Sequence, residues 1–176
     1  MQLKNQRSID DASASASEEG FAQSVLDQVA ETMHAAAYPV KQLGDRELLV
    51  DVRAEISNYP IYIFWWPEQN SFMQTAMIDL VVEKEHSEIY KLLALINSEL
   101  LYGHFDIDPE HGTLMFRNTQ IVPPDTKFAK ELVDTFIDEA VDQCEKYYAA
   151  LLLVLRDRLS AREALTRGST DIDGLA

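Results

Sequence analysis

Five side chains that could bind a metal ion or transfer protons fall close together in the segment YGHFDIDPEHG, residues 102–112. They are His104, Asp106, Asp108, Glu110 and His111. Histidine and carboxylates are common metal ligands and common general acids and bases. A metal-binding or hydrolytic activity would therefore be sought first in this segment.

The spacing within the segment favours a β-hairpin over a metal site. Alternate residues of a strand share a face, so His104, Asp106 and Asp108 would lie on one side, as they would on any solvent-facing edge. Residues 108–112 are typical of a tight turn, since Pro presets φ and Gly supplies a permissive conformation. A calcium-binding EF-hand loop counted from Asp106 would need Gly at position six and Glu at position twelve, but His111 and Arg117 stand there. We therefore expect no metal ligands here.

Other catalytic signatures are missing from the sequence. There is no GxSxG elbow, GxGxxG loop or GxxxxGK[ST] loop. The single cysteine, Cys144, lies on the apolar stripe of a long expected helix, where core packing is the simpler interpretation. The sequence predicts a non-enzymatic protein with no catalytic residues and no cofactor.

Composition limits the possible partners. The chain has 176 residues, 47% of them hydrophobic, which fits one domain with a substantial core. Its net charge of −15 disfavours nucleic acid and anionic membrane surfaces. No apolar run reaches the roughly 18 residues of a membrane-spanning helix, and the N-terminal residues lack the apolar core of a signal peptide. We expect a cytoplasmic protein without nucleic-acid or membrane partners.

Hydrophobic periodicity predicts an α+β domain with an antiparallel sheet and helices in the order α-βββ-α-ββ-α. The expected helices span residues 18–37, 86–101 and from 125 or 126 to 158, and the expected strands span residues 48–56, 61–66, 71–82, 104–108 and 113–122. Residues 38–42 are a candidate extra strand. Ser87 is a candidate N-cap and Gly103 a candidate C′ residue of the middle helix. The expected organisation is a disordered tail over residues 1–18, one domain over residues 19–159, and a C-terminal tail over residues 160–176 with one helical turn.

The strand IYIFWW, residues 61–66, is apolar on both faces. Ile61, Ile63 and Trp65 point one way, and Tyr62, Phe64 and Trp66 point the other. One face meets the helices, and the other needs a cover. Met73 and Met77 of the next strand could share that surface, and methionine adapts well to binding partners. This face is either that of a fully internal strand or a surface covered by a second subunit, the N-terminal helix or a client protein. We take these five residues as the candidate partner-binding set.

The long helix raises two further alternatives. Its acidic residues fall largely opposite its apolar stripe, which predicts a solvated face or a landing strip for a basic client segment. They are Glu131, Asp134, Asp138, Glu139, Asp142 and Glu145. The run AALLLVL, residues 149–155, is apolar all round, so either the domain itself or another subunit must cover it.

Three segments of the sequence, LLALINSELLYGHFDID, GTLMFRNTQIV and EAVDQCEKYY, resemble the YbjN family of bacterial sensory transduction regulators. The resemblance covers about residues 57–165. The positions that carry it are Asn97, Glu99, residues 103–106, Phe116-Arg117 and residues 144–148.

The resemblance implies a fold similar to that of type III secretion chaperones, usually homodimeric, that acts by binding other proteins. It implies no catalytic residues. We therefore expect a non-catalytic protein-interaction module, chaperone-like or regulatory, that binds another protein as a homodimer. The alternative is a metal-binding or hydrolytic protein that uses the cluster from His104 to His111.

Overall fold

The structure is a computed structural model that describes residues 25–83, 86–123, 126 and 130–173. The expected first helix is helical over residues 25–35. The start of that helix and the tail expected over residues 1–18 lie outside the described residues.

The remaining elements follow the expected order, with the candidate extra strand present. They are β1 (Val40–Gly44), β2 (Glu47–Arg53), β3 (Asn58–Trp66), β4 (Ser71–Val81), α2 (Ser87–Glu99), β5 (His104–Ile107), β6 (Thr113–Ile121), α3 (Lys130–Leu155) and α4 (Ala161–Asp173). The strands form one sheet in the order β1-β2-β3-β4-β6-β5, and every neighbouring pair is antiparallel. Because α2 joins β4 to β5, the β5–β6 hairpin returns to pair beside β4.

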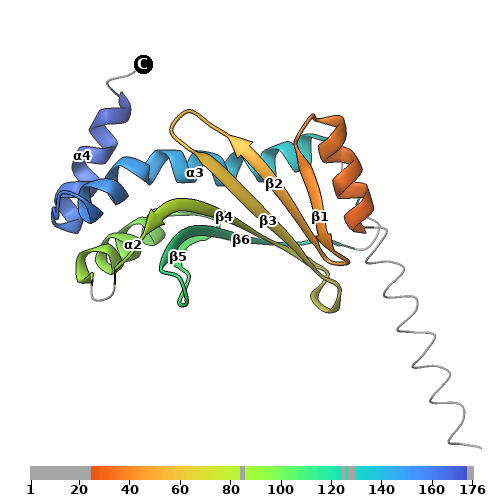
Figure 1. The fold of residues 1–176 in the computed structure, drawn as a ribbon, viewed down its shortest axis with the longest axis horizontal. Coiled ribbons are helices and arrows are strands. Elements are labelled where there is room, and N and C mark those ends of the chain that lie inside the picture. The colour runs from red at the N-terminus through yellow and green to blue at the C-terminus, as the bar shows by residue number, and fades with distance from the viewer. Residues whose placement is uncertain (1–24, 84–85, 124–125, 127–129, 174–176) are drawn as a thin grey trace, which may run out of the picture.

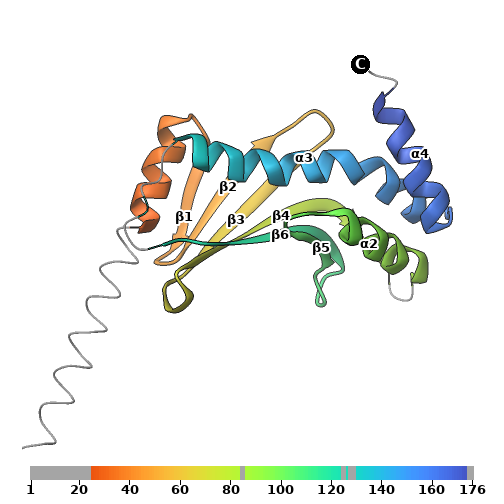
Figure 2. The ribbon, with the colours of Figure 1, turned by 180° about the vertical axis from the view of Figure 1, so that it is seen from behind.

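The helices lie on one side of this sheet. Figures 1 and 2 show α3 running along one face, with the first helix at one end and α2 and α4 together at the other end. Alternation along β3 and β4 explains this arrangement, because one set of side chains on each strand is almost entirely apolar, with Gln74 as the polar member on β4, and is buried against α3. Among the described residues, no helix crosses the opposite face of β2 and β3 (Figure 1).

The domain itself covers much of the apolar end of α3. Leu151 and Val154 are buried, and the neighbouring leucines are half-buried. Part of the cover comes from α4, which is longer than the single turn expected from the sequence and buries Ala161 and Ala164. Small residues allow the helices to approach closely, since a Cβ on Gly168 would lie 2.8 Å from the Ala150 backbone nitrogen.

Two expected details of α2 are wrong. The N-cap position is His86, and no side chain caps the helix there, because α2 starts one residue earlier than the capping pattern suggested. The helix ends at Glu99 with an extended Leu100 as C-cap, so Gly103 is not its C′ residue. Gly103 does have a positive φ of 67°, but at the approach to β5. No helix of the described residues is both long and apolar enough to span a membrane.

Candidate protein-binding face

The two faces of β3 differ sharply in burial. Ile61, Ile63 and Trp65 are at most 1% exposed. Gln74 lies opposite Ile63 on β4 and donates its amide N–H to the Phe136 carbonyl of α3 at 2.9 Å. This contact identifies the α3 side of the sheet as the core side. The alternate residues of β3 therefore point to the uncovered side.

The structure brings the five candidate residues together on that uncovered side. Strand pairing sets Phe64 directly opposite Met73, and Met77 lies two positions beyond Thr75, the partner of Tyr62. The Phe64 and Trp66 rings meet edge to face, with centroids 5.8 Å apart. We call the surface formed by Tyr62, Phe64, Trp66, Met73 and Met77 the open face.

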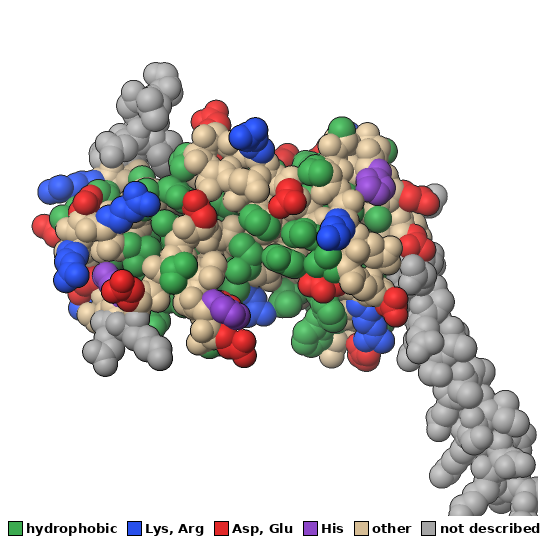
Figure 3. Space-filling view, in the orientation of Figure 1, with side chains coloured by type: hydrophobic (Ala, Val, Ile, Leu, Met, Phe, Trp, Pro, Cys, Tyr) green, Lys and Arg blue, Asp and Glu red, His purple; other side chains and the backbone are tan. Residues whose placement is uncertain are grey.

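The open face is only partly shielded from water. Trp66 is 42% exposed and the other four residues are half-buried. Figure 3 shows hydrophobic side chains gathered across the middle of the molecule in this view, with charged side chains around them. Aromatic and methionine side chains offer a large apolar area that can adapt to a partner. Among the described residues, nothing covers this side of β3 completely, so the strand is not fully internal there.

A polar group that the sequence pattern did not predict borders the open face. Arg117 of β6 lies opposite His104 of β5, with its guanidinium 3.0 Å from the Met73 sulfur and 3.4 Å from an Asp106 carboxylate oxygen. The pairing register that creates this group depends on β5 folding back beside β6. Only the alternation of β6 hinted that Arg117 would face the same way as the methionines.

The acidic cluster of residues 104–111 is divided between two structural roles. Asp106 pairs with Arg117, whereas Asp108 belongs to the hairpin turn. One oxygen of Asp108 accepts the Glu110 N–H at 3.0 Å, and the other lies 2.7 Å from His111 Nδ1. These contacts hold the pKa of Asp108 below its usual value, the backbone N–H first and the imidazole second. Among the described residues, no three His, Cys, Asp or Glu side chains converge on a point where a metal could sit.

Two of the acidic residues of α3 do not belong to a simple solvated face. Glu145 accepts the Tyr59 hydroxyl at 2.7 Å and the Ile56 backbone N–H at 3.1 Å, so it fastens the β2–β3 hairpin to α3. Asp138 accepts the Tyr38 hydroxyl at 3.4 Å. Burial, and then the neighbouring Asp138, raise the pKa of Tyr38 to about 12. Tyr38 lies 100 residues before Asp138 in the sequence, and Tyr59 lies 86 residues before Glu145. Helical periodicity gives no information about contacts between residues so far apart.

Several residues that carry the family resemblance have structural roles. Asn97 of α2 makes two hydrogen bonds with Phe105 of β5: its amide donates to the Phe105 carbonyl at 3.0 Å, and its oxygen accepts the Phe105 N–H at 2.7 Å. The Phe105 ring packs against the Phe116 and Tyr147 rings, with centroids 5.2 Å and 5.6 Å away. A Cβ on Gly103 would lie 2.4 Å from the Phe116 ring. This motif therefore locks α2, β5, β6 and α3 together.

Cys144 has the structural role expected from the sequence. Its side chain is buried in the core, and burial raises the pKa of its thiol well above the usual value, with Glu145 as a second cause. A thiol in this environment is a poor nucleophile, because the thiolate is the reactive form.

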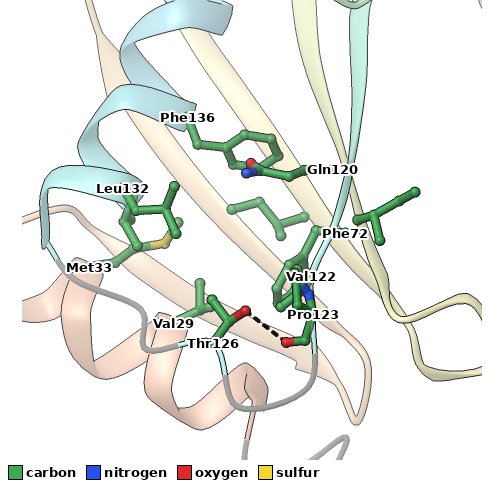
Figure 4. Close-up of a pocket in the computed structure, with 12 residues that line it drawn as sticks. Val29, Met33, Phe72, Gln120, Val122, Pro123, Thr126, Leu132 and Phe136 are labelled. Carbon is green, nitrogen blue, oxygen red and sulfur yellow. Dashed lines mark hydrogen bonds between the residues drawn. The ribbon is translucent and has the colours of Figure 1, made fainter.

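One small hollow lies on the core side. It has a volume of about 70 Å³ and lies between the first helix, the end of the sheet and the start of α3. Figure 4 shows Met33 and Leu132 on one side of it and Phe72 and Val122 on the other. Pockets for drug-sized ligands are several times larger, so this hollow does not change the choice of the open face as the candidate site.

Comparison with known proteins agrees with this architecture. A chain in the crystal structure of the ExsC–ExsE complex is similar, with a TM-score of 0.53 and 15% identity over 72% of this chain and 92% of that chain. The crystal structure of YbjN from E. coli has a TM-score of 0.49 and 14% identity over 83% of this chain and 93% of that chain. No curated protein matches the sequence.

The fold class expected from the sequence is confirmed as α+β, with the arrangement of a type III secretion chaperone. The sequence profile of the family described as "Putative bacterial sensory transduction regulator" matches residues 26–153, which include the open face and the Asn97 motif. The chain belongs to the YbjN family.

Proposed function

We propose that this protein is a non-catalytic interaction module that binds an apolar segment of another protein on its open face. The observation that carries the proposal is the position of Tyr62, Phe64, Trp66, Met73 and Met77, which lie together where no described helix covers the sheet. The resemblance to chaperone-like proteins also supports a homodimeric state and a cytoplasmic location as parts of the proposal.

The chemistry of the open face supports binding to a protein. An apolar segment laid across it would remove the exposed part of Trp66 and the half-buried methionines from water, a favourable change of roughly 25 cal/mol for each Å² of apolar surface buried. The Arg117–Asp106 pair at the border would orient the partner more than it would add affinity, because partly exposed ion pairs contribute little. No covalent chemistry is required of any residue in this arrangement.

The test compares two substitutions of equally exposed side chains. Trp66 and Leu43 are each 42% exposed, but Leu43 lies on β1, two strands from β3 in the sheet, and is not one of the five residues of the open face. We expect affinity capture from a native lysate to recover a specific protein with the unchanged chain and with Leu43→Asp, and to lose it with Trp66→Asp. Light scattering at micromolar concentration measures the homodimeric state in all three proteins.

Two results would count against the proposal. If the same protein is recovered equally well with Trp66→Asp, the open face is not its binding site. If Leu43→Asp loses the protein as completely as Trp66→Asp, the effect is one of added charge and not of position.

A further inference from the structure

The outer edge of β6 is only partly occupied. Its partner β5 begins at His104, which pairs with Arg117, so β5 pairs with no residue of β6 beyond Arg117. On the other side, β4 continues to pair with β6 as far as Ile121, opposite Ser71. Among the described residues, β6 therefore has a pairing partner on one side only over residues 118–121.

The free side of residues 118–121 presents backbone hydrogen-bonding groups. In an antiparallel ladder each residue directs its N–H and C=O to one side, and successive residues alternate. Val122 donates its N–H to Asn70 on the β4 side, and Thr113 accepts from Asp108 on the β5 side. By this alternation, Thr119 and Ile121 direct their N–H and C=O groups outward. No described backbone or side-chain group bonds to them there.

A hollow lies between this free edge and α3. It has a volume of about 470 Å³, and Leu132, Phe136 and Glu139 of α3 line its helical side. Two of its lining side chains are strongly exposed apolar groups, since Tyr102 is 61% and Ile121 74% exposed. Figure 4 shows Gln120 of β6 beside Phe136 of α3.

The charge of the hollow points to the sign of its occupant. Glu139 is the single ionisable carboxylate of its lining, and it makes no hydrogen bond or ion pair with any other described residue. The whole chain carries a net charge of −15. Both features favour a basic side chain and disfavour an acidic one.

We propose that an extended, basic segment of a partner protein adds a strand to residues 118–121 of β6, in line with β5. Its backbone pairs with the outward groups of Thr119 and Ile121, which is the mode known as β-augmentation. Side chains on one of its faces enter the hollow, where apolar ones contact Leu132 and Phe136 and a Lys or Arg reaches Glu139. This goes beyond the open-face function, because it assigns a second surface and a second kind of contact.

The geometry limits the length of that segment. A strand rises about 3.3 Å per residue, so the four free residues of β6 match about four residues of the partner. Because α3 follows β6 in the chain and runs back along the sheet, Leu132 near its start lies closer to Ile121 than Glu139 does. Leu132 and Ile121 also line the smaller core-side hollow together. The basic side chain would therefore sit towards the Asn118 end and the apolar one towards the Ile121 end.

The probe for this proposal is a library of random heptapeptides displayed on phage and selected on the full chain. We expect the selected peptides to alternate apolar residues and to include a Lys or Arg. Their affinity should fall about tenfold with Thr119→Pro, which removes one outward N–H. It should also fall with Glu139→Lys, and selection on that variant should favour acidic peptides. Phe64→Asp, on the open face, should leave peptide affinity within about twofold.

The inference is overturned if the selected peptides bind both Thr119→Pro and Glu139→Lys as tightly as the unchanged chain, or if no peptide is enriched. Glu139→Lys keeps the test valid if Thr119→Pro does not fold, since Glu139 is only partly buried and has no described partner. Because Trp66→Asp tests the open face alone, either proposal can fail while the other stands.

Discussion

Replacement of Asn97 by alanine tests whether the family motif is structural. The Asn97 side chain on α2 makes two hydrogen bonds with the backbone of Phe105 on β5, one to its carbonyl and one from its N–H, and these bonds join the two elements. Alanine keeps the helix, because it has the highest helix propensity, and removes only the amide. The Phe105 side chain is 2% exposed, so its backbone lies at the edge of the core, where water replaces a lost partner poorly.

The expected cost follows from these two bonds. A neutral hydrogen bond contributes about 1 kcal/mol net, and a buried group left without a partner adds to the loss. Asn97 itself is half-buried, so water reaches part of the space that alanine leaves. We therefore expect the free energy of unfolding to fall by about 2–3 kcal/mol. For a domain of this size that is a drop in Tm of roughly 4–12 °C.

Urea unfolding followed by circular dichroism measures the change. Ser98→Ala is the matched control, since Ser98 donates only to the Leu95 carbonyl of its own helix and is exposed. It should alter the free energy of unfolding by less than about 0.5 kcal/mol. Asn97→Asp keeps the acceptor but places a carboxylate oxygen against the Phe105 carbonyl.

The Asn97→Asp variant also makes a prediction about pH. Its carboxyl needs a proton to donate to the carbonyl, so its folded pKa should lie above the ordinary value of about 3.9. A raised folded pKa favours the folded state at low pH. The loss of unfolding free energy in this variant should therefore shrink as the pH falls through the folded pKa of the new carboxyl. The structural interpretation is refuted if Asn97→Ala unfolds within about 0.5 kcal/mol of the unchanged chain yet loses its captured partner.

Three further outcomes can be checked. Gly103→Ala should lower the free energy of unfolding by about 2 kcal/mol or more, because the φ of Gly103 is 67° and an added Cβ would lie 2.4 Å from the Phe116 ring. Gly44→Ala is the control, since a Cβ there would have no atom within 4 Å, and it should be neutral in the same urea titration. Cys144 should react with iodoacetamide at pH 8 only as fast as the protein unfolds, since burial raises its thiol pKa; rapid labelling of the folded protein by mass spectrometry would contradict this. The pKa of Asp108 is lowered in the folded protein, so its stabilisation of the hairpin is present above the usual pKa of 3.8 and is lost as the pH falls through the lower folded pKa. Amide hydrogen exchange of the hairpin should show this pH dependence, and Asp108→Asn should remove it.

Local patterns predicted the elements and the faces of the sheet. The alternation in residues 61–66 separated the buried Ile63 and Trp65 from Tyr62 and Phe64, because a strand has a period of two and needs no knowledge of its neighbours. The turn at residues 108–112 was predictable for the same reason, since it depends on consecutive residues. Hence the five open-face residues could be named before the structure, although the face they form depends on which strands are neighbours.

Contacts between distant segments could not be predicted. Glu145 was assigned to a solvated face because its helical position is polar, yet the β2–β3 hairpin folds over α3 and brings Tyr59 and Ile56 to it. The free edge at residues 118–121 exists because β5 begins only at His104. Gly103, just before β5, and Asn97 on α2 position that beginning, and neither belongs to β6. Periodicity reports how one element divides its side chains, and it carries no information about which element will meet them.

The polar residues that looked most suited to function are already used by the fold. Asp106, Asp108 and Glu145 each accept or pair within the chain, and a partner that recruited them would first have to break those contacts. Groups without such contacts offer their full interaction energy to a partner. Among the described residues they include the half-exposed apolar side chains around Trp66, the outward backbone groups near Ile121 and the Glu139 carboxylate. Because these three carboxylates are paired within the chain and the apolar face and strand edge are not, substitutions that abolish binding without unfolding should fall on those two surfaces.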